Sequence, residues 1–129
     1  MAKLIIGSGP VIVENSKVLL NRDRKDSFWK FCGGQVEESE HCLKAVAQRE
    51  AKEEMGIDLE FADNDPFLYY VKKDDDVSVI LAHFLAKRVG DIKAGPDTIE
   101  WSWISIDDLQ SHDLAPNIIP ALKHFSYIN

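Results

Sequence analysis

The sequence has few of the residues that mark secreted, zinc-binding or disulfide-stabilised proteins. Only two of its 129 residues are cysteines, Cys32 and Cys42, and the four histidines form no zinc-binding spacing with them. The sequence leaves a disulfide between the two cysteines open, but nothing in it predicts an oxidising compartment. Both cysteines are interpreted as small, partly buried residues.

Long apolar runs and an excess of positive charge are also missing. No stretch approaches the roughly 20 apolar residues that span a bilayer, and the apolar start at 1–6 is too short for a signal peptide. Asp and Glu number 22 against 15 Lys and Arg, which gives a net charge of −7. A protein that coats nucleic acid needs a basic stripe. We therefore expect a cytoplasmic protein that binds neither nucleic acid nor a membrane.

The order of the predicted elements indicates an α+β fold with a mixed sheet. The length suits a single domain over residues 1–129, and no repeat, low-complexity tract or linker divides it. The hydrophobic periodicity and turn residues predict the elements. They are a hairpin with strands at 11–13 and 17–20, strands at 28–31, 66–72, 77–87 and 98–105, a helix over about 40–55, a helical turn at 107–109 and a helix over 116–125. Ser39 is the predicted N-cap of the long helix, and Gly56 its left-handed C-cap.

Three glutamates of the long helix, Glu50, Glu53 and Glu54, have i, i+3, i+4 spacing. On an α-helix this spacing puts their carboxylates on one face, where like charges repel. A hard divalent cation removes the conflict, because Mg²⁺ binds a few carboxylates together with water and substrate phosphate oxygens. The pattern therefore suggests a metal site for phosphate chemistry.

A solvated acidic helix face is the alternative interpretation, since glutamate is a good helix former and nearby Arg49 can neutralise it. The residues one and two turns earlier on the same face, however, are Leu43, Val46 and Ala47. A surface helix places its acids opposite its apolar residues, whereas here the acids continue the apolar stripe. We therefore expect the three glutamates to line a cavity or cleft.

The block that starts at Gly33-Gly34 and ends with Arg49-Glu50-Ala51-Lys52-Glu53-Glu54-Met55-Gly56-Ile57 resembles the Nudix box. That signature reads Gly, five residues, Glu, seven residues, then Arg-Glu-aliphatic-x-Glu-Glu-x-Gly-aliphatic. Phe31, the segment 100–109 and the segment 114–117 are also similar to family members, so the resemblance covers most of the chain. It implies a MutT-like αβα sandwich around a mixed sheet, with the box forming a loop, a helix and a loop.

The resemblance implies a hydrolase that cleaves a nucleoside diphosphate linked to another group, with Mg²⁺ as cofactor and Mn²⁺ as a substitute. The implied metal ligands are the Gly33 carbonyl, Glu50, Glu53, Glu54 and, from outside the box, Glu100. Glu50 is alternatively the general base, and Arg49 orients the glutamates by ion pairing, so Arg49, Glu50 and Glu53 form the predicted catalytic set. Attack at phosphorus needs a positioned water and neutralised oxygens, which metal ions held by one helix supply.

The sequence departs from the family pattern at two places. Residues 41–48, one more than the family spacing, separate Glu40 from Arg49, which leaves open whether Glu40, Glu37 or Glu38 is the first box glutamate. Cys32 stands where many members have proline. Because no histidine partner is evident for a nucleophilic thiol, we assign Cys32 to packing beside the glycine turn.

Recognition of the substrate is assigned to residues outside the box. Arg22 and Arg24 could pair with phosphates, Trp29 could stack on a base, and Asn117 could hydrogen-bond a purine edge. Each has a plainer alternative, namely a solvated loop charge, a core aromatic residue or a helix cap. We expect a small nucleotide as the substrate, and favour a nucleoside triphosphate cleaved to monophosphate and pyrophosphate over a nucleotide sugar or ADP-ribose.

Two functions of other classes compete with this hypothesis. A non-catalytic nucleotide-binding module on the same fold usually lacks one of the box glutamates, and this chain keeps all three. An isomerase on the same fold would use a cysteine and a histidine-bound metal, and the histidines here do not cluster. The sequence leaves the oligomeric state open between a monomer and a homodimer.

Overall fold

The computed structural model describes residues 2–23 and 27–129. Their elements, in chain order, are β1 Lys3–Val11, β2 Val13–Glu14, β3 Lys17–Asp23, β4 Gly34–Gln35, α1 Leu43–Met55, β5 Asp58–Phe61, β6 Phe67–Asp74, β7 Val77–Val89, β8 Thr98–Ser105, the 3-10 helix η1 Ile106–Ser111 and α2 Ile118–His124. Neither α-helix is long and apolar enough to cross a membrane. The cytoplasmic location stays a prediction.

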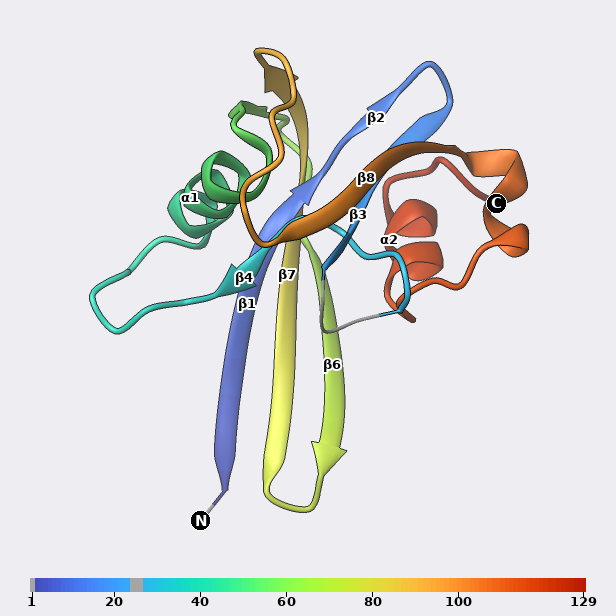
Figure 1. Ribbon diagram of the computed structural model, residues 1–129. Coiled ribbons are helices and arrows are strands. Elements are labelled where there is room, and N and C mark those ends of the chain that lie inside the picture. The colour runs from blue at the N-terminus through green and yellow to red at the C-terminus, as the bar shows by residue number, and fades with distance from the viewer. Residues whose placement is uncertain (1, 24–26) are drawn as a thin grey trace.

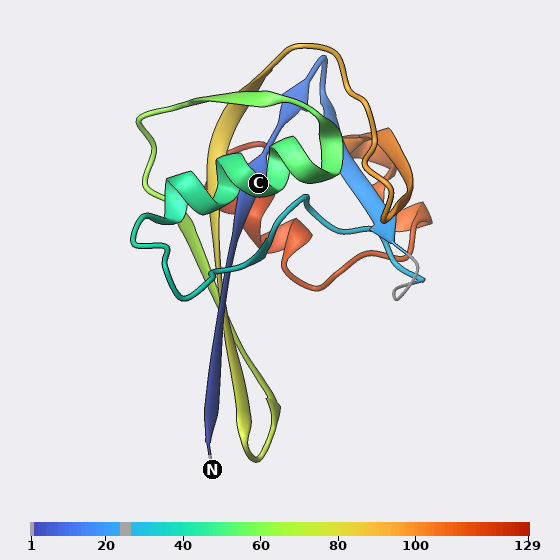
Figure 2. The same ribbon diagram turned by 60° about the vertical axis from the view of Figure 1, so that its left-hand side comes forward.

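Two sheets form the centre of the fold, and the first is mixed. In it β1 runs parallel to β7 and antiparallel to β4, while β7 also pairs antiparallel with β6 and β5. The second sheet has the order β2-β3-β8. Helices α1 and α2 lie on opposite sides of the sheet in both ribbon views (Figures 1 and 2). The predicted α+β fold with a mixed sheet is thus confirmed.

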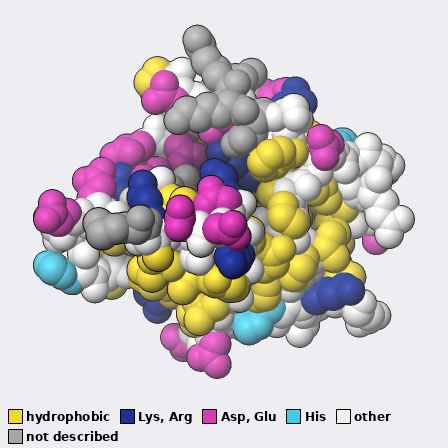
Figure 3. Space-filling view, turned by 90° about the horizontal axis from the view of Figure 1, so that it is seen from below, with side chains coloured by type: hydrophobic (Ala, Val, Ile, Leu, Met, Phe, Trp, Pro, Cys, Tyr) yellow, Lys and Arg dark blue, Asp and Glu magenta, His cyan; other side chains and the backbone are white. Residues whose placement is uncertain are grey.

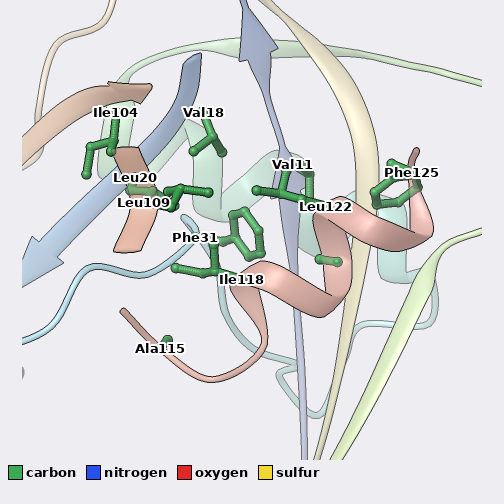
Figure 4. Packing of buried hydrophobic residues seen from close by; sticks show 11 residues of the cluster. Val11, Val18, Leu20, Phe31, Ile104, Leu109, Ala115, Ile118, Leu122 and Phe125 are labelled. Carbon is green, nitrogen blue, oxygen red and sulfur yellow. The ribbon is translucent and has the colours of Figure 1, made fainter. Parts of the chain in front are cut away.

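The largest core cluster lies between α2 and the sheets. Apolar residues of β1, β3, β8 and α2 meet there, together with Phe31 from the segment before β4. Figure 4 shows Phe31 among Val11, Ile118 and Leu122. A second cluster packs the buried face of α1, including Ala51 and Met55, against the β2–β3 hairpin. Helix α1 is therefore fixed to the sheets along one apolar face.

Residues 3–10 form most of β1, a part of the strand that the sequence did not predict. A Cβ atom at Gly9 would overlap the carbonyl oxygen of Cys32, so this glycine serves a close approach of two backbones and not a turn. The short strand β5 was also not predicted. The predicted strand at 28–31 is wrong, because this segment makes only the isolated bridges Asn21–Lys30 and Trp29–Leu114.

Helix α1 begins three residues later than predicted, at Leu43. Its N-cap is Cys42, which makes no side-chain cap, so the Ser39 cap is wrong. The C-cap prediction is confirmed, since Gly56 has a φ of 68° and its N–H donates to the carbonyl of Lys52. The hairpin around residues 15 and 16 and the strands β6, β7 and β8 also lie where the sequence predicts them.

Candidate active site

The three glutamates of helix α1 differ in how far their side chains are exposed. The Glu50 side chain is 13% exposed, whereas that of Glu53 is 59% exposed. Glu54 is partly buried at the end of the helix, near the start of β8. The apolar stripe through Val46 and Ala47 therefore continues into Glu50 and Glu54, while Glu53 faces solvent.

The glycine pair ahead of β4 lies directly against these glutamates. A Cβ atom at Gly34 would overlap the carboxyl group of Glu50, so only glycine fits there. The Gly33 N–H donates to Glu54 Oε2 at 3.3 Å, and the Gly33 φ of +156° with Ser8 O close behind disfavours any side chain. The loop and the helix thus fit together only through the two glycines.

Arg49 organises the acids around it. Its Nη1 lies 2.8 Å from Glu50 Oε1 and 3.3 Å from Glu53 Oε2, and its Nη2 donates to the carbonyl of Gln35 at 3.1 Å. Hydrogen bonds to Glu40, together with nearby Glu50, raise the pKa of Arg49 further above its usual range. The guanidinium group therefore stays charged, and it contacts three of the glutamates at once.

Glu40 is the acid that completes this arrangement. Its two carboxylate oxygens accept from Arg49 Nε at 3.0 Å and Nη2 at 2.9 Å, a bidentate pair. The hydrogen bond from Arg49 lowers the pKa of the Glu40 carboxyl. The extra residue before Arg49 is absorbed in the loop ahead of Leu43, so Glu40 reaches Arg49, whereas Glu37 approaches it only at 3.5 Å.

The Glu54 carboxylate accepts hydrogen bonds from two elements outside α1. Besides the Gly33 N–H, Asn21 Nδ2 on β3 donates to its Oε1 at 2.9 Å. Burial, followed by the neighbouring Glu50 carboxyl, raises the pKa of Glu54 to about 8, and the Asn21 hydrogen bond opposes this rise. Asn21 is 2% exposed and was not identified from the sequence, although a polar residue that ends the apolar run 18–20 is a usable signal.

A cavity of about 200 Å³ opens beside this helix. It is lined by Asp23, Lys30, Gly33, Glu50, Glu53, Glu54, Pro96, Asp97 and Thr98. Lys30 Nζ lies 2.6 Å from Asp23 Oδ2, at the strand end opposite α1. Asp97 comes from the loop between β7 and β8, which meets α1 where the Gly95 N–H donates to the Glu54 carbonyl. The expected cleft is present, and the sequence missed the contribution of this loop.

The other sequence-predicted site residues lie elsewhere. Arg22 and Glu100 form an ion pair on β3 and β8, and neither lines the cavity. The Arg22 guanidinium also lies 4.9 Å from the centre of the Trp29 ring. Asn117 is 5% exposed, and its Nδ2 lies 3.1 Å from His83 Nε2, so its amide is engaged in the core. Arg24 lies outside the described residues.

Cys32 packs in the core beneath the glycine pair. It is 3% exposed, in the cluster with Ile12, Leu19 and Met55. Burial, and secondly the nearby glutamates, raise the pKa of its thiol well above its usual value. A protonated, buried thiol is a poor nucleophile, so the structure supports the packing role.

The donor set suits a hard cation. Among the described residues, no three His, Cys, Asp or Glu side chains are already arranged to hold a metal ion. Mg²⁺ does not need such a cage, because it keeps several waters and binds one or two carboxylates plus substrate phosphate oxygens. The lining carboxylates are oxygen donors, and the buried Glu54 beside Glu50 carries the charge conflict that a cation relieves. The residues present therefore fit a magnesium ion.

Carboxylates on one helix, fixed by an arginine and a glycine loop beside a cavity, suit a hydrolase that acts on phosphoric anhydride bonds, and this class is borne out by the comparisons. A family model described as a NUDIX domain matches residues 8–125, so the chain belongs to the Nudix family. No curated protein matches the sequence in a separate search.

Solved structures with the same fold include a MutT NUDIX hydrolase from Burkholderia pseudomallei, at 23% identity and a TM-score of 0.82, covering 96% of this chain and 99% of that one. A MutT protein from Methanosarcina mazei Go1 is 27% identical, with a TM-score of 0.75 and coverage of 92% and 88%. A C. elegans Ap4A hydrolase is 20% identical, with a TM-score of 0.79 and coverage of 95% of each chain. Each of these structures is matched over more than nine tenths of the present chain.

Proposed function

We propose that this chain is a Mg²⁺-dependent pyrophosphohydrolase of nucleoside diphosphate derivatives, with nucleoside triphosphates cleaved to monophosphate and pyrophosphate as the favoured reaction. The observation that carries the proposal is the cavity, where Glu50, Glu53 and Glu54 lie together beside Gly33. Such a wall repels a phosphate chain unless divalent cations lie between them. An anionic substrate and a cation therefore depend on one another in this site.

The proposed roles follow from the contacts of each residue. Glu53 and Glu54, with the Gly33 carbonyl, would hold Mg²⁺, which neutralises phosphate oxygens and lowers the pKa of a bound water. Glu50 accepts a proton from the attacking water or serves as a further ligand. Arg49 keeps Glu50 and Glu53 in position through its hydrogen bonds, and its own attachment to Glu40 limits its motion.

A carboxylate from outside the box is also proposed for the site. Glu100 stays the predicted residue, but its pairing with Arg22 engages its carboxylate away from the cavity. Asp97 lines the cavity, so we favour it for this role. Loss of activity in Asp97→Asn with full activity in Glu100→Gln would support Asp97, and the reverse pattern would restore Glu100.

The proposal that the substrate is a nucleotide is supported by an aromatic residue near the cavity and by one structural relative. Trp29 is only partly buried, with Arg22 over its ring, and it directly precedes Lys30, which lines the cavity, so an aromatic side chain lies next to the cavity in sequence. One structural relative is named for hydrolysis of Ap4A, a nucleotide. Asn117 is less suited to bind a purine edge than the sequence implied, because His83 already engages its amide.

The experiment is a panel of nucleoside triphosphates, nucleotide sugars, dinucleotides and ADP-ribose, read as phosphate release with a coupled phosphatase and repeated in EDTA. Turnover that needs Mg²⁺ or Mn²⁺ and is highest for a triphosphate supports the proposal. Preference for a nucleotide sugar or ADP-ribose would overturn the triphosphate assignment and keep the nucleotide class. Full turnover in metal-free buffer, or binding without turnover, would overturn the metal mechanism or the catalytic role.

A further inference from the structure

Asn21 is a buried polar residue at the end of an apolar run on β3. It is 2% exposed, and residues 18–20 before it are buried as well. On the side of β3 that faces α1, Leu19 packs with Ala51 and Met55 of the helix. Side chains two positions apart on a strand share a face, so an apolar residue at position 21 would continue this core. The amide therefore departs from the packing around it.

The backbone of Asn21 is held on both of its edges. Its N–H donates to the Lys30 carbonyl at 2.9 Å, and its own carbonyl accepts from the Lys30 N–H at 2.9 Å. On the other edge, Asn21 pairs with Trp101 of β8. The side chain is thus presented to α1 from a strand that is fixed by two neighbours, which is a precise way to place a polar group.

The amide of Asn21 uses its donor and not its acceptor. Nδ2 donates to Glu54 Oε1 at 2.9 Å, whereas Oδ1 is buried and has no hydrogen-bond partner among the described residues. A buried acceptor without a partner destabilises the folded state, and an apolar side chain of the same size would avoid this loss. Stability therefore does not explain an asparagine at this position, and its contact with Glu54 does.

The Glu54 carboxylate is held at both oxygens by donors from outside α1. Asn21 engages Oε1, and the Gly33 N–H engages Oε2 at 3.3 Å. Both donors are neutral, in contrast to the charged Arg49 that pairs with Glu40. A neutral donor fixes the direction of a carboxylate without cancelling its charge. Lone pairs and negative charge on Glu54 therefore both remain for a cation.

Negative charge by itself does not single out Glu54 as a ligand. The chain has a net charge of −7, and Figure 3 shows many Asp and Glu side chains, mainly in the left half of that view. A carboxylate that is already held in one orientation loses less conformational freedom when it binds than a freely rotating one. Fixing the carboxylate thus raises its affinity for a cation above that of its acidic neighbours.

We propose that Asn21 is a positioning residue for Glu54, whose carboxylate it holds in the orientation that binds Mg²⁺. The role rests on the proposed function, because it needs a divalent cation at Glu54. Asn21 is not among the residues that line the cavity, so it acts through Glu54 and not by contact with the substrate. Its loss should therefore weaken the binding of the cation and not that of the nucleotide.

The test is Mn²⁺ binding to the free protein, read as loss of the electron paramagnetic resonance signal of the unbound ion. Asn21→Leu keeps the size of the side chain and removes the donor, and should weaken Mn²⁺ binding by about tenfold or more. Asn21→Ala, which adds no volume to the core, should give the same loss. The Mg²⁺ concentration for half-maximal turnover should rise by a similar factor, with the nucleotide KM at saturating Mg²⁺ unchanged.

Ser8→Ala is the matched control for a buried polar contact to α1. Ser8 is also 2% exposed, and its Oγ donates to the backbone carbonyl of Leu43 at 2.7 Å, so it holds the helix without touching a glutamate. Thermal melting in EDTA should show a folded protein for each variant. Ser8→Ala should leave Mn²⁺ affinity as in the wild type, and an equal loss in this variant would overturn the positioning role.

A double-variant cycle separates positioning from a general change of the fold. In a Glu54→Gln background, Asn21→Leu should change Mn²⁺ affinity by less than about twofold, because the group through which Asn21 acts is already neutral. The same loss in both backgrounds, or an unchanged affinity in Asn21→Leu, overturns the role and leaves the proposed function intact. A wild type that binds no Mn²⁺ overturns the metal mechanism and the role together.

Discussion

The cavity and the three-stranded ribbon formed by residues 3–6 of β1, 68–74 of β6 and 77–81 of β7 differ in how their side chains are partnered. At the cavity, Arg49 contacts Glu40, Glu50 and Glu53, so these carboxylates are held by charge-assisted hydrogen bonds within the chain. On the ribbon, the strands pair with one another through their backbones, but Leu4, Leu68 and Tyr70 are each more than half exposed. The cavity side chains are thus fixed by polar contacts within the chain, whereas the exposed apolar side chains of the ribbon are not covered by it. The predictions below test the polar contacts of the cavity first and then the buried residues of the sheets.

The largest effect is expected at the cavity. Glu53→Gln and Glu54→Gln should each lower kcat by roughly two orders of magnitude or more, because each removes charge from the proposed metal site. The melting temperature without metal should stay the same or rise, since repulsion is relieved. Steady-state kinetics and thermal melts in EDTA check both. Wild-type kcat in either variant would refute the assignment, and a fall of many degrees would show that these glutamates are structural.

A smaller loss is expected when the organiser of the cavity is changed. Arg49→Lys keeps the charge but loses the planar fork that contacts Glu40 and Glu50 together. We expect kcat to fall by about tenfold or more, with little change in KM, because the ions and not Arg49 contact the phosphates. Lys44→Arg, an exposed change on the same helix, is the control. A raised KM with unchanged kcat would instead mean that Arg49 binds substrate.

The pH dependence of the unfolding free energy tests the burial of His83 in the mixed sheet. Burial lowers the pKa of His83 on β7 from 6.5 to about 4, so the folded state binds fewer protons than the unfolded state between these values. Its contribution is therefore complete above about pH 6.5 and is lost as the pH falls toward 4, by roughly 3 kcal/mol. Urea unfolding at several pH values measures this loss.

The acid-side loss should shrink in His83→Gln, which keeps an amide near Asn117 without a titrating ring. His112→Gln, at a partly exposed position, is the control and should leave the loss as in the wild type. An unchanged acid-side slope in His83→Gln would mean that other groups cause the loss. Neither residue lines the cavity, so turnover at neutral pH serves as a check on folding.

The smallest effect is expected for Cys32→Ala. The side chain fills a small volume beside Met55 and Ile12, so its truncation should cost about 1 kcal/mol of unfolding free energy and leave kcat nearly unchanged. Denaturant titration and the coupled phosphatase assay measure the two quantities. If activity were lost while the fold persisted, thiol chemistry would have to be reconsidered.

The sequence predicted the features that depend on local pattern and missed those that depend on contacts between segments far apart in the chain. The acidic stripe on α1 follows from helical periodicity, and its burial at Glu50 and Glu54 could be expected from Val46 and Ala47. The arrival of Asp97 at the cavity depends on how a loop crosses the end of α1, which no local pattern encodes. The same holds for Glu40, whose partner is fixed by where the helix begins.

The ribbon shows a different limit. The sequence predicts strands at residues 67–71 and 79–85 both where a helix covers them and where none does. An apolar pattern shows that a segment favours burial, but it does not show whether another element covers it. The strand β1 was hidden by its glycines, which break strands on average. Only the crossing of Cys32 over Gly9 explains why a glycine is required in the middle of a strand.

That crossing has a consequence for how this chain tolerates mutation. Gly7 and Gly9 are both buried on β1, two positions apart, and sequence alone gives them equal standing. A methyl group at Gly7 would meet the end of the Leu81 side chain at 3.0 Å, which can rotate away, and the Gly34 carbonyl oxygen at 3.3 Å, which needs to shift by only a few tenths of an ångström, whereas at Gly9 it would overlap backbone atoms of Cys32 and Gly33. In a library of variants, alanine should survive at Gly7 and be eliminated at Gly9.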